Sequence, residues 1–180
     1  PSFVRQIENQ NLHALNIPEL TIITPAALQT EAERVAQLHR EEGLTVAVIE
    51  QEKIFNEFSS GTPDASAYRR LMKMFYDRAE GNENVRPRYL LLFGDGSYNN
   101  RKSMEKLHSP ECNMLLTYQS KTSIDERESF VIEDYFGFLE DNSGEEIKVD
   151  KVCLGIGRFP ISSIKNARLV VDKLYRYVHD

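Results

Sequence analysis

The sequence lacks any long apolar run. Hydrophobic residues make up 41% of its 180 residues and charged residues 28%, but no stretch approaches the roughly 18 consecutive apolar residues that suggest a membrane-spanning helix. The N-terminal residues, PSFVRQIENQ, also lack the basic region and apolar core of a secretory signal peptide. We therefore expect no membrane span and no signal peptide in this segment, and the start at Pro1 suggests a piece of a longer protein.

Cysteine and positive charge are both scarce. The two cysteines, Cys112 and Cys153, are too few for a disulfide framework. Cys153 lies in an apolar run, where a free thiol behaves as a small hydrophobic side chain. A net charge of -6 opposes binding to phosphate backbones, and no stripe of Lys and Arg offsets it locally. We expect no nucleic-acid partner.

Several signatures of catalysis are also missing. The conspicuous run RYLLLFGDGSYNNR, residues 88–101, contains neither G-x-G-x-x-G nor Gly-Lys-Ser/Thr, which argues against a dinucleotide or phosphate loop. The G-x-S-x-G elbow is absent too, so Ser97 is a poor candidate for a nucleophile. His108 and Cys112 are four residues apart, but Pro110 disrupts a shared helical face. We expect both to be loop residues rather than the thiol–imidazole pair of a cysteine peptidase.

Three short apolar runs alternate with two stretches of helical periodicity. The runs, which predict strands, are residues 20–24, 44–50 and 88–93. The helices are predicted to begin at Thr24-Pro25 and at Thr62-Pro63-Asp64, where a capping side chain accompanies proline. Strands that alternate with helices predict right-handed crossovers and a mainly parallel sheet. We therefore predict one α/β domain over residues 1–180, a three-layer α/β/α sandwich.

The remaining segments give weaker patterns. We expect an irregular connection at 51–61, a strand at 114–118, two strands at 130–139 and 147–157 joined by a turn at 140–144, and a final helix capped by Ser162 or Ser163. The buried face of that helix is predicted to consist of Ile164, Ala167, Val171, Leu174 and Val178.

Asp95 follows the third predicted strand and lies between two glycines. In open parallel sheets, ligand-binding groups gather beyond the C-terminal ends of the strands. Gly94 and Gly96 would let the backbone turn sharply and approach another group closely there. The alternative is that the glycines merely end the strand while Asp95 caps a turn. The sequence leaves both interpretations open.

Oxygen-bearing side chains are concentrated in residues 132–150, IEDYFGFLEDNSGEEIKVD. They could hold calcium if this segment folds back towards Asp95. The segment lacks the spacing of an EF-hand loop, and the spacing alone favours a solvated acidic turn. No cluster of Cys and His predicts a zinc site, and we expect no organic cofactor.

Five strings, in this order, resemble the gingipain-like cysteine peptidases of family C25, and within that family the sortases of the type IX secretion system. They are IFNEFSSGTPDASAYRRLMKMFYDRA, RYLLLFGDGSYNNRKS, MLLTYQSKTS, EDYFGFLEDNSGEE and LGIGRFPISSIKNARLVVDKLYRY, and the similarity covers residues 20–180. The resemblance implies two adjacent Rossmann-like, caspase-like subdomains, of which this chain would be the first. The family's catalytic His lies in a Gly-His-Gly string and its catalytic Cys follows an Ala. Neither string occurs here, so the resemblance assigns no catalytic residue to this chain.

The resemblance also implies partners and a location. The longer protein would be a cysteine endopeptidase outside the cytoplasm, at the outer membrane or cell surface, that cleaves C-terminal sorting signals. Its partners would be the C-terminal catalytic subdomain of the same chain, protein substrates and secretion-system components. The family's calcium binding makes Asp95, Asp141 and Asn142 the metal candidates. The competing hypothesis is a stand-alone α/β ligand-binding or regulatory module that uses a crevice at residues 94–97.

Overall fold

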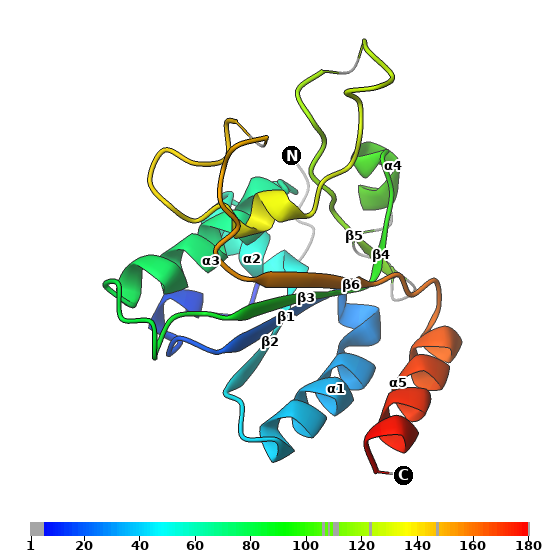
Figure 1. Cartoon of the computed structure of the whole chain (residues 1–180). Coiled ribbons are helices and arrows are strands. Elements are labelled where there is room, and N and C mark those ends of the chain that lie inside the picture. The colour runs from blue at the N-terminus through cyan, green and yellow to red at the C-terminus, as the bar shows by residue number, and fades with distance from the viewer. Residues whose placement is uncertain are drawn as a thin grey trace.

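A parallel four-stranded sheet forms the centre of the fold (Figure 1). The computed structural model describes residues 6–105, 107, 109, 112–122, 124–146 and 148–179. The strands are β1 (Leu20–Thr24), β2 (Val46–Glu50), β3 (Tyr89–Phe93) and β6 (Gly155–Phe159), in the order β2-β1-β3-β6. Every neighbouring pair is parallel, which confirms the predicted sheet.

Helices cover both faces of this sheet, so the predicted three-layer α/β/α sandwich is confirmed (Figure 1). Helices α1 (Gln29–Glu41) and α5 (Ile164–His179) lie on one face, and α2 (Gln51–Phe58) and α3 (Ser66–Arg78) lie on the other. The short elements are the 3₁₀-helices η1 (Leu12–Ala14), η2 (Ala26–Leu28) and η3 (Asp134–Gly137), helix α4 (Asn100–Met104), and the paired strands β4 (Asp95–Gly96) and β5 (Met114–Leu115). Within the described ranges, no helix has the length and hydropathy of a membrane span.

Two hydrophobic clusters hold the layers together, one on each face of the sheet. Successive side chains of a strand point to opposite faces, so Ile22 belongs to one cluster and Ile23 to the other. The predicted helix stripes face these clusters, and their most buried members are Leu28, Ala32, Val35 and Ala36 of η2 and α1, and Tyr68, Leu71, Met72 and Phe75 of α3. Helical periodicity therefore identified the inward faces of α1 and α3 correctly.

The structure differs from the sequence prediction where residues far apart along the chain meet. Residues 51–61 were expected to be irregular but contain helix α2, which begins directly after β2. Residues 130–139 form no strand. Their aromatic residues belong instead to η3, where Phe136 packs on Tyr68 of α3 with ring centroids 5.5 Å apart. The predicted hairpin across 140–144 is also wrong, because β6 pairs in parallel with β3.

Strand edges and helix starts differ in smaller ways. The predicted strand at 44–50 is present as β2, but it lies at the sheet edge, and four of its five residues are only half-buried. Thr24 does not cap a helix, because its hydroxyl donates to the carbonyl of Phe93 at 3.2 Å. Ser163 does cap α5 as predicted, since its Oγ accepts from the N–H of Asn166 at 3.1 Å.

Strand β1 contains two buried threonines that differ in the hydrogen bonding of their hydroxyl groups. The side chains of Thr21 and Thr24 are both 0% exposed. The Thr24 hydroxyl has carbonyl partners, whereas Thr21 Oγ1 is, within the described residues, the one buried side-chain polar atom with no hydrogen-bond partner. A buried hydroxyl without a partner keeps its desolvation cost and gains nothing in return.

Substituting these threonines should therefore change stability in opposite directions. Thr21→Val should raise the free energy of unfolding by about 1 kcal/mol, because it removes an unpaired buried hydroxyl. Thr24→Val should lower it by about 1 kcal/mol, because it removes a hydrogen bond that is made. Urea-induced unfolding measures both changes. Equal destabilisation by the two substitutions would show that the Thr21 hydroxyl is paired in solution.

Candidate functional site

The turn at residues 94–97 follows β3 at the C-terminal edge of the sheet. Two of its residues form β4, which pairs in parallel with β5. Gly94 is buried where no side chain fits, since a Cβ atom would lie 3.0 Å from both the carbonyl oxygen of Asn113 and Cγ of Leu115. The close backbone approach expected from the glycines is therefore present. The group that approaches is the chain's own β5 segment.

Arg158 of β6 ties this turn to three other segments. Its guanidinium donates to the carbonyl oxygens of Gly94 and Asp95, both at 3.2 Å, and to that of Leu116 at 3.1 Å. It also forms a two-point ion pair with Glu133, at 2.9 and 3.1 Å. The Arg158 side chain is only 12% exposed. A buried cation of the chain itself thus occupies the strand-end crevice.

The Glu133 carboxylate is held in place at an electrostatic cost. Burial raises the pKa of Glu133 even though Arg158 lies against it, because loss of water disfavours the charged form. Ion pairs of this kind add little net stability compared with apolar side chains of the same size. Their geometric effect is larger, because the planar fork of an arginine accepts a carboxylate in one orientation. The pair therefore fixes where η3 meets the sheet.

Asn100 closes the other side of the turn. Its side-chain amide accepts from the N–H of Thr117 at 3.0 Å and donates to the carbonyl of Thr117 at 2.7 Å, as a neighbouring strand would. The hydroxyl of Thr117 donates to the carbonyl of Ser97 at 2.7 Å. Ser97 Oγ accepts from the N–H of Asn99 at 3.1 Å. The serine hydroxyl therefore takes part in the hydrogen bonds of its own turn.

The three predicted metal ligands do not gather in one place. Asp95 Oδ1 accepts from the N–H of Gly96 at 2.9 Å. Asp141 pairs with Lys73 of α3 at 2.8 Å, and the hydrogen bond from this lysine lowers the pKa of Asp141. Asn142, next to it, is exposed and has a left-handed φ of 62°. Figure 1 shows the loop after η3 and strand β4 at different ends of the fold.

As they are placed, these three residues do not fit a shared calcium site. Over the described ranges, no group of three or more His, Cys, Asp or Glu side chains could hold a metal ion. Other acidic oxygens of the segment have partners within the chain: Asp150 accepts from the N–H groups of Gly144 and Glu146. Calcium binding stays a prediction, which rests on the resemblance.

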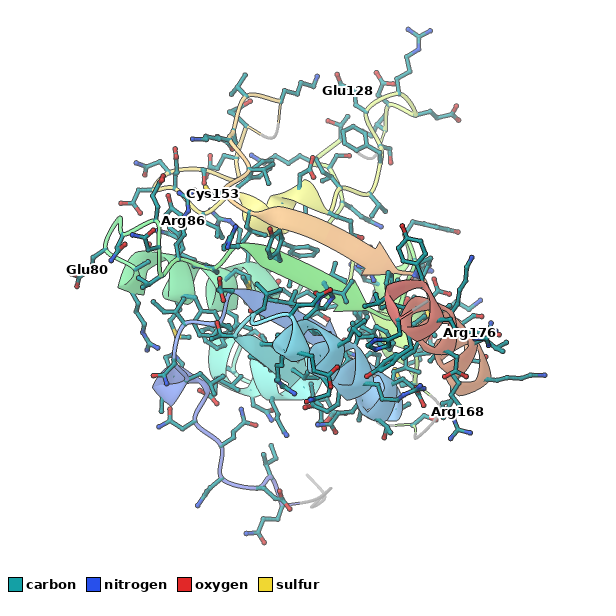
Figure 2. All side chains as sticks on the ribbon, turned by 60° about the horizontal axis from the view of Figure 1, so that its bottom comes forward. Glu80, Arg86, Glu128, Cys153, Arg168 and Arg176 are labelled. Atoms are coloured by element: carbon teal, nitrogen blue, oxygen red, sulfur yellow. The ribbon has the colours of Figure 1, made fainter. Side chains whose placement is uncertain are left out.

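The cysteines and histidines lie in several separate places. Cys112 is 3% exposed. Figure 2 shows half-buried Cys153 close to Arg86 at the opposite end of the sheet from the turn, where both line one cavity. The histidines that the structure describes contact other residues: His13 pairs with Glu57, His39 pairs with Glu42, and the ring of His179 lies 5.8 Å from that of Tyr175. His108 lies outside the described residues, so its predicted loop position beside Cys112 stays a prediction.

The parallel sheet and its filled strand-end crevice can be compared with known proteins. The family model described as peptidase family C25 matches residues 13–180. The chain belongs to peptidase family C25. Members of this family are cysteine peptidases, and the resemblance seen in the five strings is confirmed at that level. No curated protein sequence matches the chain.

One solved structure of a larger protein contains a part that is similar to this C25 chain. It is the crystal structure of dimeric latent PorU from Porphyromonas gingivalis, to which the chain is similar with a TM-score of 0.83 and 45% sequence identity. The match covers 95% of this chain and 16% of that one. The chain thus spans 16% of the length of the relative that it matches.

Sequence analysis missed the pairing of Arg158 with Glu133. Arg158 is the lone charge in the apolar string GIGRFP, and a buried charge needs a partner, so its position was a usable signal. Glu133 was counted among the oxygen-bearing side chains of residues 132–150. The two lie 25 positions apart, and only the crossover from η3 to β6 brings them together.

Removing the Arg158 guanidinium should destabilise the fold. Arg158→Met is expected to lower the free energy of unfolding by about 1 to 3 kcal/mol, because it leaves a half-buried carboxylate, 29% exposed, without its partner. Adding Glu133→Leu should recover part of this loss, since removing both charges of a buried pair is often nearly neutral. Urea-induced unfolding of both variants measures the effect. A single variant as stable as the wild type would mean that Arg158 does not hold the turn.

A calcium titration tests the metal prediction directly. If Asp95 and Asp141 are ligands, calcium added to chelator-treated protein should raise the melting temperature, and the double variant Asp95→Asn, Asp141→Asn should lose the rise. Saturation to 100 times the Kd corresponds to about 2.7 kcal/mol of stabilisation. Lys73→Met should strengthen the response, because it frees Asp141. No shift, or the same shift in the double variant, would exclude these ligands.

Proposed function

We propose that this chain is the non-catalytic, N-terminal subdomain of a secreted or surface cysteine endopeptidase. Membership of family C25 and the similarity to PorU support this proposal. The longer enzyme would act as a type IX secretion sortase that removes C-terminal sorting signals from its protein substrates. It would work outside the cytoplasm, at the outer membrane or cell surface, together with secretion-system components. Its catalytic His and Cys would lie outside residues 1–180, so this chain alone would be inactive.

The observation that carries the proposal is an uncovered side of the fold at β6 and α5. In the described part of the chain, β6 has one neighbour in the sheet, β3. Its outer edge therefore presents backbone N–H and C=O groups that pair with no other strand. Proteins normally protect or pair such an edge, because it invites association with another polypeptide.

Helix α5 extends this uncovered side. On the side that faces α1, Asp172 accepts from the Arg34 guanidinium at 2.7 Å, and the Tyr175 hydroxyl donates to the carbonyl of Arg34 at 2.8 Å. Ala167 and Val171 point to the sheet and are fully buried. Of the predicted buried face, Ile164 and Val178 are instead exposed, at 43% and 40%. The apolar surface of α5 is therefore wider than the sheet covers.

An apolar stripe follows the flank of α5 that faces away from α1. Val170, Leu174 and Tyr177 are spaced as i, i+4 and i+7, which places them on one side of the helix. Val170 is 38% exposed and Tyr177 is 86% exposed. We infer that the catalytic subdomain packs on this stripe and on the outer edge of β6, which would orient it against the scaffold.

The test uses the longer protein that includes the missing His and Cys. Val170→Asp combined with Tyr177→Asp should lower its kcat/KM for a peptide substrate about tenfold or more, because charges would be buried at the contact. Leu169→Asp is the matched control, since Leu169 is 58% exposed on the same helix but outside the stripe. In residues 1–180 alone, all three substitutions should leave the melting temperature nearly unchanged.

Two results would contradict the proposal. The first is thiol-dependent peptide hydrolysis by residues 1–180 alone. The second is a longer protein in which the stripe variant is as active as the Leu169→Asp control.

A further inference from the structure

A second surface feature lies at the C-terminal edge of the sheet, away from α5. Residues 118–122 and 124–132 project from this edge beside α4 (Figure 1). Between the projecting segment and the start of α4 is a cavity of about 410 Å³. Its lining includes Tyr98, Asn100, Arg101, Gln119, Phe130 and Val131.

Three apolar side chains of this cavity are in contact with water. Tyr98 is 78% exposed, Phe130 is 42% exposed and Val131 is 38% exposed. They come from two segments, the start of α4 and the far arm of the projection, and converge on one hollow. Clustered exposed apolar groups with a polar rim are typical of binding surfaces.

The projecting segment also has an open backbone edge. Gln119 and Val131 form an antiparallel bridge. The hydrogen bonds of this bridge are made by the flanking residues, with the Ser120 N–H donating to the carbonyl of Phe130 at 3.0 Å and the Ile132 N–H making the second bond. In this pattern, the N–H and C=O of Gln119 itself point away from the opposite arm. Over the described residues, neither group has a hydrogen-bond partner.

Part of the same backbone edge is already paired, because a side-chain amide forms the two hydrogen bonds that a neighbouring strand would form. Thr117, two residues earlier, points its N–H and C=O to the same side as Gln119. Both groups of Thr117 are held by the side-chain amide of Asn100. Beyond this amide, the backbone groups of Gln119 are open to a partner as far as the described residues show. Paired backbone donors and acceptors on an open edge fit an extended peptide better than a small molecule.

The charge of the cavity favours one kind of peptide. Arg101 is the one charged residue in the lining, which contains no carboxylate. Arg101 is exposed, and it forms no ion pair with any residue that the structure describes. On a chain with a net charge of -6, an exposed guanidinium in a lining without acids is a local site for a negative group.

We propose that this cavity binds an extended peptide segment in which a bulky apolar residue and a carboxylate are two positions apart, so that both side chains lie on the same side of the peptide. The apolar side chain packs against Tyr98, Phe130 and Val131. The peptide backbone pairs with the open edge at Gln119, and the carboxylate meets Arg101. This binding is a property of the chain itself. Only the further step, that the bound peptide belongs to a substrate of the longer enzyme, rests on the proposed function.

Fluorescence anisotropy with defined peptides tests this proposal. The probe is fluorescein-labelled Gly-Phe-Val-Glu-Val-Gly, in which Phe and Glu share one side of the extended peptide, and the matched peptide has Gln in place of Glu. The wild-type chain should bind the Glu peptide roughly twofold to fivefold more tightly, as an exposed ion pair allows. Arg101→Gln should remove this difference. Phe130→Ala should weaken both peptides about fivefold or more, because it removes an apolar anchor.

The control is Arg176→Gln, which removes an exposed arginine from α5, a helix that contributes no residue to the lining of the cavity (Figure 2). It should leave both affinities unchanged, and the melting temperature of each variant shows that it is folded. No binding of the Glu peptide by the wild type would overturn the proposal. Wild-type affinity for the Glu peptide in Arg101→Gln and Phe130→Ala would also overturn it. The readout is binding by residues 1–180, so either result leaves the proposed peptidase function to its own test.

Discussion

One buried guanidinium organises the C-terminal edge of this sheet. Arginine carries five N–H donors in a rigid fork and has no neutral form in a protein, so a buried arginine must be surrounded by acceptors. Arg158 meets this demand with the Glu133 carboxylate and three backbone carbonyls. These acceptors come from the turn after β3, from the end of β5 and from the start of η3. The need to satisfy one cation therefore fixes how three loops are arranged.

This arrangement bears on function, because it fills the place where open α/β sheets commonly hold a ligand. The turn at residues 94–97 packs against Arg158 and Thr117, and its glycines give room to the chain's own atoms. Open surfaces lie elsewhere and include the outer edge of β6, the apolar stripe of α5 and the cavity beside α4. These are surfaces of the kind that polypeptides recognise.

Features set by neighbouring residues were predictable from the sequence, and those set by distant residues were not. The runs 20–24 and 88–93 are central strands for reasons that are visible locally, because the first is rich in β-branched residues and the second in leucine and aromatic residues. The aromatic run before residue 140 looked like a strand for the same reason. Its side chains are buried against α3 instead, which no local pattern reveals. The predicted metal ligands show the same limit, since Asp141 is paired with Lys73, 68 positions away.

The sheet order β2-β1-β3-β6 also has a kinetic consequence. β3 lies next to strands that start at residues 20 and 155, so its two ladders join the beginning and the end of the sequence. Parallel ladders between such distant segments form slowly, because the chain must lose the entropy of closing a long loop before the stabilising contacts form. During synthesis, the guanidinium at position 158 leaves the ribosome only after all of its acceptors. The loops at the strand ends therefore lack the hydrogen bonds from this guanidinium until translation of this segment is nearly complete.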